Sequence, residues 1–369
     1  MTPPTLLVQE YLRAGGTRES LLTDHGVHMK QPRNGKVSFI YDQLEAKDDD
    51  PIAQECRGLI LREGSWDIVA FPFRRFFNHG QGAAARIDWD SAQFEEKLDG
   101  TLLIVYFDHE LGEWHCATRS ACEAHLKYNG FAFRELADMA ARDMGFGGLG
   151  NLFSIGGTDR TYMVELTAPE NQIVCEYADR KLTLLGIRDL RTHKEINPMC
   201  DSMGHTLGVP RAWYFDNFEH LAEVIKTWHP KKYEGVVVKD RHFNRIKVKS
   251  PAYLAAHHAI DSLGSSWRAV VGAVASGAAN DLDGIIPPFV QKRVDEARNR
   301  LRGLCAETRE AYSRHAHIED QKAFALAVKH ERWPAALFAL RNGKAETPEH
   351  FASRTLVNGL TQTLGLGDA

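Results

Sequence analysis

The stretch Glu96–Tyr106, "EKLDGTLLIVY", places a lysine two residues before an Asp-Gly pair and continues into a run of branched and aromatic residues. Such a run is typical of a buried β-strand, and an Asp-Gly pair favours a tight turn. Lys97 is therefore expected at the mouth of a strand. It is either a solvated charge beside a turn or a nucleophile held over a bound ligand.

Short strand-like runs surround this stretch between about residues 37 and 250. Each is rich in branched or aromatic residues and bounded by polar turns; they include residues 37–44, 57–63, 101–107, 114–119, 161–167, 181–189 and 234–240. Helical patterns cover 122–145 and 217–230. After about residue 253, Ala-, Leu- and Arg-rich segments with helical period follow, among them 288–316 and 319–343. We predict an α+β fold with antiparallel sheets over residues 1–253 and an all-helical domain over residues 254–369.

The composition is that of a soluble globular protein, with 43% hydrophobic and 25% charged residues in a chain of 369. No apolar run reaches the roughly 20 residues that span a bilayer, and the N-terminal residues lack the features of a signal peptide. The six cysteines are scattered without a Cys-x-x-Cys pair, which argues against a thiolate zinc site and for reduced thiols in a cytoplasmic protein. The net charge of −4 means that any contact with nucleic acid has to come from a local cluster of basic residues.

A predicted hairpin at residues 233–250, "YEGVVVKDRHFNRIKVKS", carries such a cluster. Strand alternation places Lys247 and Lys249 on one face, and places Glu234 on the same face as Val236 and Val238. Two like charges on one face are unfavourable unless an anion lies between them. The alternatives are a solvated edge strand protected by lysines and a phosphate site, which needs further cations and a carboxylate.

Further basic residues are available close to strands. Arg57 precedes a strand, Arg75 stands next to two phenylalanines, and Arg119 follows a strand. Glu165 occupies the less apolar face of the run 161–167. Each of these residues alone is more often a surface charge than a ligand, so the interpretation depends on their order and spacing together.

In that order, the segments resemble the motifs of the covalent nucleotidyltransferases, which include ATP-dependent DNA ligases, RNA ligases and mRNA capping enzymes. "EKLDGT" resembles the Lys-x-Asp-Gly motif, and the later motifs are similar to "YMVELTAP", "KLTLLGIRD", "EGVVVK" and "IKVKS". "ECRGLIL" and "FPFRRFFNHG", ahead of the lysine, resemble the RNA ligase 1 type of the T-even phages, the tRNA-repair ligases. The resemblance covers about residues 40–253. No OB-type β domain is readable after the last motif, which disfavours a DNA ligase or a capping enzyme.

The resemblance implies an adenylation domain at residues 1–253 and a helical domain at 254–369 with a role in RNA specificity. It also implies three nucleotidyl transfers. Lys97 attacks ATP and forms lysyl-AMP, and the AMP then moves to an RNA 5′-phosphate. Finally an RNA 3′-hydroxyl attacks the adenylated end and AMP leaves. The implied substrate is RNA with 5′-phosphate and 3′-hydroxyl ends, with tRNA as one candidate. A catalytically silent RNA-binding protein and a capping-type guanylyltransferase are the alternatives; the oligomeric state is left open.

The residues expected to act follow from the same resemblance. Nucleotide contacts fall to Arg57, Arg75, Lys97, Gly100, Arg119, Glu165, Lys247 and Lys249, and catalysis to Lys97, Asp99, Glu165, Glu234, Lys247 and Lys249. Mg²⁺ or Mn²⁺ is expected on Glu234, with Asp99 and Glu165 as further ligands, and contact with the ribose is an alternative role for Glu165. At positions 75 and 119 the family carries lysine where this chain has arginine, which keeps the positive charge and replaces a compact ammonium by a planar guanidinium.

The proposed nucleophile requires a neutral amine. A free lysine has a pKa of about 10.4, so only about one in 10³ is neutral at pH 7. Burial and the neighbouring charges of Arg57, Lys247 and Lys249 are expected to lower the pKa of Lys97. Arginine could not replace it, because a guanidinium does not lose its proton in proteins.

The helical tail offers a second basic feature. Arg298, Arg302 and Arg309 fall on one face of the predicted helix 288–316. The simpler interpretation is a solvated helix face with ion pairs between neighbouring turns. The alternative is a surface that docks RNA through its phosphates.

Overall fold

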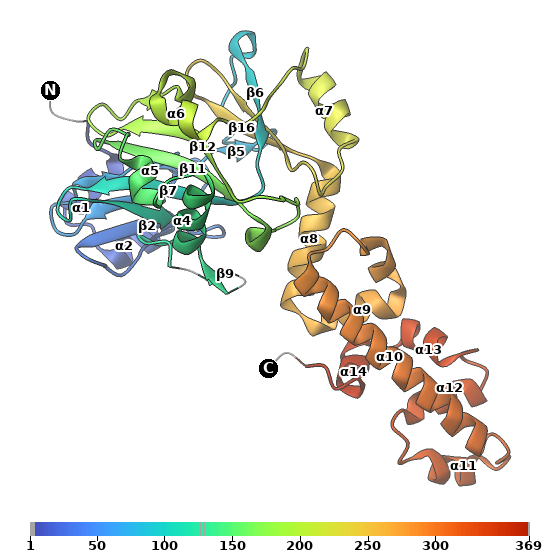
Figure 1. Ribbon diagram of the computed structural model, residues 1–369. Coiled ribbons are helices and arrows are strands. Elements are labelled where there is room, and N and C mark those ends of the chain that lie inside the picture. Colours follow the sequence, from blue (N-terminus) through green and yellow to red (C-terminus); the bar gives the residue numbers. More distant parts are fainter. Residues whose placement is uncertain (1–3, 126, 129, 368–369) are drawn as a thin grey trace. The chain divides into compact units, whose positions relative to one another are not determined.

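The computed structural model describes residues 4–125, 127–128 and 130–367 (Figure 1). The chain divides into two compact units, Met1–Tyr253 and Leu254–Ala369. The first unit is α+β with largely antiparallel sheets, and every regular element described after residue 254 is helical. The predicted fold class is therefore confirmed.

A four-stranded antiparallel sheet opens the first unit. Its strands, in the order β1-β2-β3-β4, are Val27–Met29, Lys36–Tyr41, Arg57–Arg62 and Ile68–Ala70. The helices α1 (Leu7–Arg13), α2 (Arg18–His25) and α3 (Pro51–Glu55) bury Val8, Leu21 and Ala53 in the core of this sheet. These helices and β1 are too short for their periodicity to predict them from the sequence.

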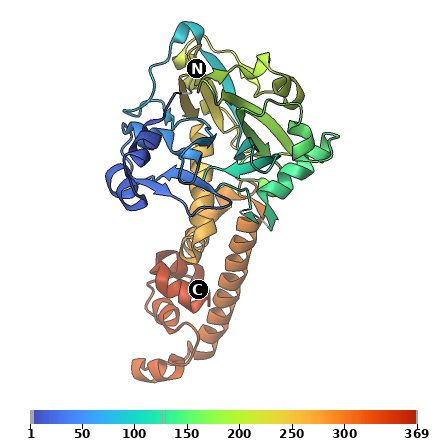
Figure 2. The ribbon, with the colours of Figure 1, turned by 90° about the vertical axis from the view of Figure 1, so that its left-hand side faces the viewer.

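The central sheet has five antiparallel strands. They run β13-β12-β11-β7-β8, with the bounds Glu195–Ile196, Lys181–Asp189, Arg160–Thr167, Thr101–Asp108 and Glu113–Thr118. Residues 102–107 of strand β7 are all apolar because both faces of the strand are covered. Leu103 and Val105 pack with α4 (Phe133–Asp143), α5 (Leu149–Phe153) and α6 (Ser202–Leu207), whereas Ile104 and Tyr106 pack against the first sheet. Figure 2 shows α4 on the outer side of this sheet.

The third sheet carries Lys97 and the last two of the predicted motifs. Its order is β14-β6-β15-β16-β5, with the bounds Ala212–Trp213, Gln93–Lys97, Gly235–Lys239, Arg245–Lys249 and Phe77–Asn78. Only the pairing of β16 with β5 is parallel among its described strand pairs. One face is apolar and packs on α7 (Phe218–Lys226), with Val236, Val238 and Leu221 fully buried. The opposite face is therefore free to carry the charged side chains.

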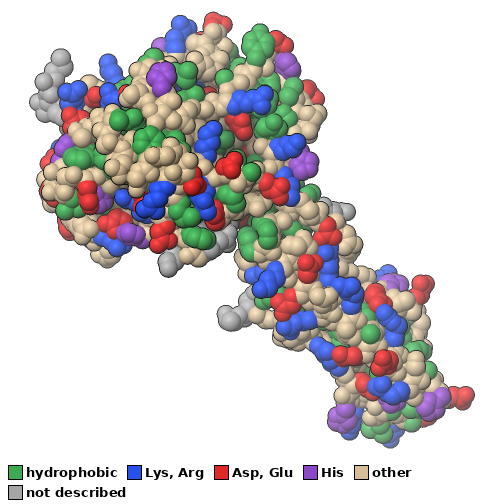
Figure 3. Space-filling model, viewed as in Figure 1, with side chains coloured by type: hydrophobic (Ala, Val, Ile, Leu, Met, Phe, Trp, Pro, Cys, Tyr) green, Lys and Arg blue, Asp and Glu red, His purple; other side chains and the backbone are tan. Residues whose placement is uncertain are grey.

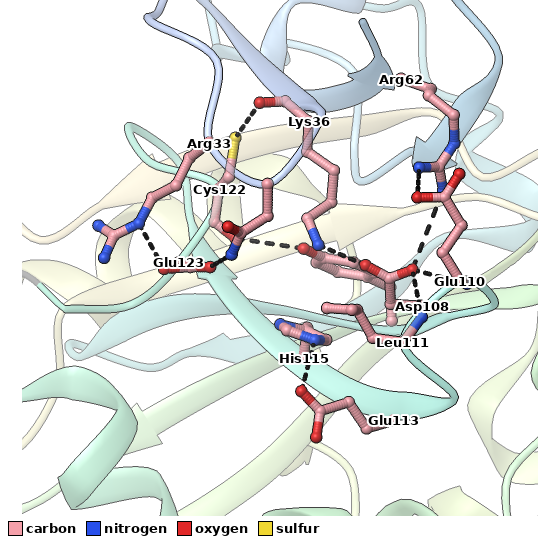
Figure 4. A network of polar contacts seen from close by, with 12 residues as sticks. Arg33, Lys36, Arg62, Asp108, Glu110, Leu111, Glu113, His115, Cys122 and Glu123 are labelled. Carbon is pink, nitrogen blue, oxygen red and sulfur yellow. Dashed lines mark hydrogen bonds and ion pairs between the residues drawn. The ribbon is translucent and has the colours of Figure 1, made fainter.

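A buried polar network joins the first sheet to the central sheet (Figure 4). Lys36 on β2 forms an ion pair with Asp108 on β7, and their side chains are 0% and 1% exposed. The Tyr106 hydroxyl donates to the carbonyl of Cys122, 3.3 Å away, whose thiol in turn contacts the Lys36 carbonyl. A buried charge is tolerable only when it is paired, so this contact fixes how the two sheets lie against each other.

The predicted helix over 122–145 is wrong in its first half. Strands β9 (Lys127–Tyr128) and β10 (Phe131–Ala132) form a short hairpin, and α4 begins only at Phe133. Gly130, between these strands, has a φ of +89°. This conformation favours glycine and is incompatible with a continuous α-helix. Residues 126 and 129 lie outside the described part.

The second unit contains the helices α8 to α14. Helix α8 (Pro251–Ser265) begins within the first unit. The helices that follow are α9 (Trp267–Ser276), α10 (Pro288–His315), α11 (Gln321–Val328), α12 (Pro334–Arg341), α13 (Pro348–Arg354) and α14 (Val357–Thr363). The pattern over 319–343 forms two helices because Pro334 starts a new one. Short 3₁₀ helices occur at Trp89–Ser91, Pro169–Asn171, Pro198–Cys200 and Ala278–Leu282. Within the described residues, no helix has the length and apolar character needed to cross a bilayer.

Candidate active site

The backbone pairing of the third sheet brings two lysines to either side of a glycine. Lys97, the last residue of β6, lies opposite Gly235, which in turn lies opposite Lys249. Residues directly opposite in antiparallel strands point to the same face. A Cβ at Gly235 would lie 2.2 Å from the Val248 carbonyl oxygen, so the position excludes any larger residue. The two amines therefore converge above a residue without a side chain.

Glu234 binds both of these amines. Its carboxylate oxygens lie 2.7 Å from Lys97 Nζ and 2.8 Å from Lys249 Nζ, and the residue is 2% exposed. The prediction that Glu234 shares a face with Val236 and Val238 is wrong. Glu234 precedes the first residue of β15, so strand alternation does not fix its side chain, and the two ammonium groups attract it to their own face.

Asp99 forms hydrogen bonds that hold the loop after Lys97 in place. Its Oδ2 accepts hydrogen bonds from the backbone N–H groups of Val174 and Cys175 at 2.9 and 2.8 Å. Its Oδ1 accepts one from the Tyr253 hydroxyl at 2.6 Å, and the Tyr177 hydroxyl accepts the Asp99 N–H. Both oxygens of the buried Asp99 carboxylate thus have protein donors, and these contacts favour a supporting role for Asp99 over direct metal ligation.

Glu165 lies on β11 beside the same loop. The Gly100 N–H donates to its carboxylate over 3.1 Å, and burial raises the pKa of Glu165 to about 7, against the opposing effect of Lys97. Gly100 is required by the protein itself, because a Cβ there would lie 2.3 Å from the Leu166 carbonyl oxygen. The backbone that approaches Gly100 closely is therefore that of β11.

One cavity of about 240 Å³ collects most of the predicted nucleotide contacts. Its charged lining consists of Arg57, Glu95, Glu96, Lys97, Arg119, Glu165, Arg245, Lys247 and Lys249, and its apolar lining includes Phe73, Phe76, Leu98 and Val237. Lys97 is 22% exposed at this cavity. The buried Nη1 of Arg57 has no hydrogen-bond partner within the described part of the chain. An anionic ligand would satisfy it.

Arg75 lies outside this cavity. Its guanidinium stands 4.2 Å from the ring centre of Tyr41 and 4.9 Å from that of Phe77, and it forms an ion pair with Asp48 at 2.6 Å. It lines a neighbouring hollow instead. The structure does not bring Arg75 together with the other predicted nucleotide contacts, and Gly100 does not line the cavity either.

The electrostatics of the two lysines differ from the expectation. Burial acts to lower the pKa of Lys97, but the carboxylates of Glu234 and Glu165 outweigh it, and the pKa is raised. The predicted lowering is therefore wrong for this state of the protein. Lys247 is the perturbed amine: burial, together with the charges of Arg57 and Lys97, lowers its pKa to about 7. Burial also lowers the pKa of Arg57, to about 10.

The three carboxylates predicted as metal ligands do not form a metal cluster. No group of three or more His, Cys, Asp or Glu side chains suited to a metal ion occurs within the described ranges. Asp99 is occupied by protein donors, and Glu165 accepts from Gly100. Of the three, Glu234 alone lies between the amines that line the cavity.

The sequence prediction missed several residues of the site. Arg245 continues the alternation of Lys247 and Lys249, so the period of β16 could have revealed it. Phe76 lines the cavity beneath Arg57 and Lys247, whose cationic groups lie 5.4 and 5.1 Å from its ring centre. Tyr253 binds Asp99 across 154 positions of sequence, and no local signal predicts such a contact.

The arginines of the helical unit are largely paired. Arg298 binds Asp283 at 2.9 Å, Arg309 binds Glu349 at 2.7 Å, and Arg302 binds Asn299 at 2.7 Å. In Figure 3, basic and acidic side chains alternate over this unit without a continuous basic surface on the visible face. These contacts favour the solvated, ion-paired helix face over an RNA-docking surface.

Known proteins resemble this chain over the same region. A candidate bifunctional polynucleotide kinase/RNA ligase of Autographa californica nuclear polyhedrosis virus is 29% identical over 233 residues, covering 59% of this chain and 33% of that protein. RNA ligase 1 of bacteriophage TS2126 is 29% identical over 148 residues, with 38% and 35% coverage. The RNA ligase of Rhodothermus phage RM378 is 23% identical over 299 residues, with 64% and 67% coverage. The chain thus spans between a third and two thirds of the length of these relatives.

Solved structures show a weaker likeness. An archaeal ATP-dependent RNA ligase matches with a TM-score of 0.43 and 14% identity, covering 88% of each chain. A Naegleria gruberi RNA ligase variant with AMP and Mn matches with a TM-score of 0.36 and 17% identity, covering 46% of this chain and 52% of that one. Neither likeness is close enough to bear on function.

The family assignment comes from the sequence. The model of a family described as RNA ligase matches residues 55–253, which is more than half of the chain. This range contains Arg57, Lys97, Glu165, Glu234 and the lysines of β16, and it ends at the boundary between the two units. The chain belongs to the RNA ligase family.

Proposed function

We propose that the protein is an ATP-dependent RNA ligase in which Lys97 carries the adenylate. The observation that supports this most directly is the convergence of Lys97, Lys247 and Lys249 at one cavity, with Glu234 bound to two of these amines. Residues 1–253 would form the adenylation domain. The helical residues 254–369 would contribute to the choice of RNA.

In the first step, the Lys97 amine attacks the α-phosphorus of ATP. A P–N bond forms while the bond to pyrophosphate breaks, and a lysyl-AMP results. Lys247, Lys249 and Arg57 are the cations that would hold the phosphates and stabilise the charge on the transferring group. Lys97 has to lose a proton first, so its ion pair with Glu234 has to be broken or neutralised.

The next two steps join the RNA ends. An oxygen of the RNA 5′-phosphate attacks the adenylate phosphorus and frees Lys97, leaving an RNA with a 5′–5′ pyrophosphate linkage to adenosine. The RNA 3′-hydroxyl then attacks the 5′-phosphorus of the RNA and releases AMP. RNA with 5′-phosphate and 3′-hydroxyl ends is therefore the proposed substrate, and a nicked tRNA is one such molecule.

The residues present fit a nucleotide and one divalent cation. The unpaired Nη1 of Arg57 needs an acceptor, which a phosphate oxygen would supply. Mg²⁺ usually keeps several waters and takes one or two carboxylates together with substrate phosphates, so Glu234 would hold it and Asp99 would not. The metal would neutralise phosphate charge. At Glu234 it would also weaken the stabilisation of the Lys97 ammonium.

The test is labelling with ATP carrying ³²P at the α-phosphate. Wild-type protein should become labelled on a denaturing gel with ATP and not with GTP, and the label should chase into a 5′-phosphorylated RNA that then circularises. Lys97→Ala should take up no label. Lys97→Arg should also fail, since arginine keeps the charge but supplies no neutral nitrogen. Lys226→Ala, an exposed lysine on α7, is the matched control and should label normally.

Each alternative gives another result. A capping-type enzyme would label with GTP, and a silent RNA-binding protein would label with neither nucleotide. Labelling of Lys97→Ala at the wild-type rate would rule out the proposed mechanism.

A further inference from the structure

A second and larger hollow adjoins the cavity of Lys97 within the first unit. Its volume is about 740 Å³, against about 240 Å³ for the cavity. Phe73, Phe76 and Arg245 line both spaces. A chain lying in the hollow would therefore reach the reacting lysine without leaving the protein surface.

The lining of this hollow is strongly basic, and we name it the basic groove. Its charged residues are Arg74, Arg75, Arg188, Lys194, Arg241 and Arg245, against the single carboxylate of Glu195. Glu195 lies between two guanidinium groups, at 3.0 Å from Arg188 and 2.7 Å from Arg245. The side chains of these two arginines are 8% and 6% exposed. One buried carboxylate thus serves two buried cations.

Three carboxylates outside the lining compensate only part of the positive charge of the groove. Arg74 binds Glu55 at 3.0 Å, Arg75 binds Asp48 at 2.6 Å, and Arg241 binds Asp88 at 2.6 Å. Together with Glu195, there are therefore four carboxylates for the six basic residues of the groove. No ion pair of Lys194 occurs within the described residues, and the buried Arg75 Nη1 and Arg188 Nε have no hydrogen-bond partner there. The groove is short of anions.

Aromatic rings lie among these cations. Phe73, Phe76, Phe77 and Phe243 line the groove. Phe243 has a φ of +63°, a conformation that is unfavourable for a large side chain. Hydrogen bonds of 2.9 Å from the N–H groups of His242 and Asn244 to the Asp240 carboxylate hold the turn that presents it. Cations interleaved with aromatic rings suit a single strand, whose phosphates and unstacked bases are both accessible.

We propose that the basic groove binds the single-stranded end of the RNA substrate and directs its terminal phosphate to the cavity of Lys97. Phosphates of the strand contact the groove cations, and bases rest on the partly exposed rings of Phe76 and Phe243, since Phe73 and Phe77 are only 5% and 4% exposed. This inference rests on the proposed function. The competing occupant is the pyrophosphate part of ATP, but the groove has three times the volume of the cavity and carries rings that a diphosphate does not need.

The experiment removes two exposed cations of the groove in the full-length protein. In Lys194→Ala/Arg241→Ala, affinity for a fluorescent, 5′-phosphorylated single-stranded RNA is measured at several salt concentrations. If each cation contacts one phosphate, the slope of log affinity against log salt should fall by about 1.4, since single strands lose about 0.7 per contact. Arg142→Ala/Lys226→Ala removes two exposed charges on α4 and α7 and is the matched control. Its slope should equal that of wild type.

Adenylation of Lys97 without RNA is the second readout. A loss in RNA binding that exceeds any loss in adenylation supports the groove as a strand site. A wild-type salt slope in Lys194→Ala/Arg241→Ala overturns it, and a loss confined to adenylation assigns the groove to the phosphates of ATP. If wild type forms no adenylate at all, the proposed function fails, whereas the salt slopes still report whether RNA lies in the groove.

Discussion

Two lysine–carboxylate pairs in the first unit show how the surroundings change what an ion pair can do. Lys36 and Asp108 are 0% and 1% exposed, and they join two sheets. Lys97 and Glu234 are 22% and 3% exposed, and Lys97 lines a cavity. Glu234 is also shared with Lys249 at 2.8 Å, whereas the second cation near Asp108, Arg62, lies 3.9 Å away. The first pair can only stabilise the fold, whereas the second has an amine that a ligand can reach.

The largest contrast is expected in activity. Lys97→Ala should reduce the formation of the protein adenylate by at least about 10³-fold, because the covalent bond has no other acceptor. Its free energy of unfolding should change by less than about 1 kcal/mol, since Glu234 keeps its contact with Lys249. Gel labelling and urea denaturation measure the two effects. If Lys97→Ala lost adenylation because it unfolded, the Lys97–Glu234 pair would be structural in the same way as the Lys36–Asp108 pair.

Lys36→Met should show the opposite behaviour. It leaves the carboxylate of Asp108 buried without its ammonium partner, which is expected to cost about 3–5 kcal/mol of unfolding free energy. Adding Asp108→Leu should recover much of the loss, because a buried apolar pair leaves no charge unpaired. Urea denaturation is the measurement. A single variant as stable as wild type would show that the pair does not hold the sheets together.

Glu165 should make stability depend on pH. Burial raises its pKa from the ordinary 4.5 to about 7, so its protonated form is favoured in the folded protein. Its contribution is fully present below about pH 4.5 and is lost as the pH rises to about 7, by up to about 3 kcal/mol at about 1.4 kcal/mol per pKa unit. Glu165→Gln should therefore gain stability relative to wild type between pH 4.5 and 7, as thermal denaturation at several pH values would show. An equal difference at all pH values would contradict this.

The smallest predicted effect concerns the pH dependence of adenylation. The carboxylates around Lys97 raise its pKa, so the rate should rise with pH as the ammonium loses its proton. Glu234→Gln removes the first of these carboxylates and should shift the rising limb to lower pH, even though the maximal rate falls. Measured rates from pH 6 to 10 would show this. A limb that stays in place would mean that Glu234 does not stabilise the ammonium.

The fold class could be predicted because it depends on local periodicity. The two-sided burial of β7 and the helical spacing after residue 253 are both readable in the sequence. The helix predicted at 122–145 failed because a hairpin around Gly130 interrupts an otherwise helical composition. The structural role of Lys36 could not be foreseen, since its partner lies 72 positions away.

The candidate site was predictable where motif residues share one sheet face. Lys97, Lys247 and Lys249 line the cavity because strand pairing places them there, and their order in the sequence already indicates it. The failures concern partners from distant segments. Asp99 is bound by residues 75 to 154 positions away, and the proton on Lys97 is held by Glu234, 137 positions away.

The hydrogen bond between Tyr253 and Asp99 has a practical consequence for dividing the chain. The loop that follows Lys97 depends on a hydroxyl from the first turn of α8, a helix that continues past residue 253. A shortened protein that ends at Ser250 would lack this donor and leave one oxygen of a buried carboxylate without it. A stand-alone catalytic fragment should therefore extend beyond Tyr253, with enough of α8 to keep that first turn wound.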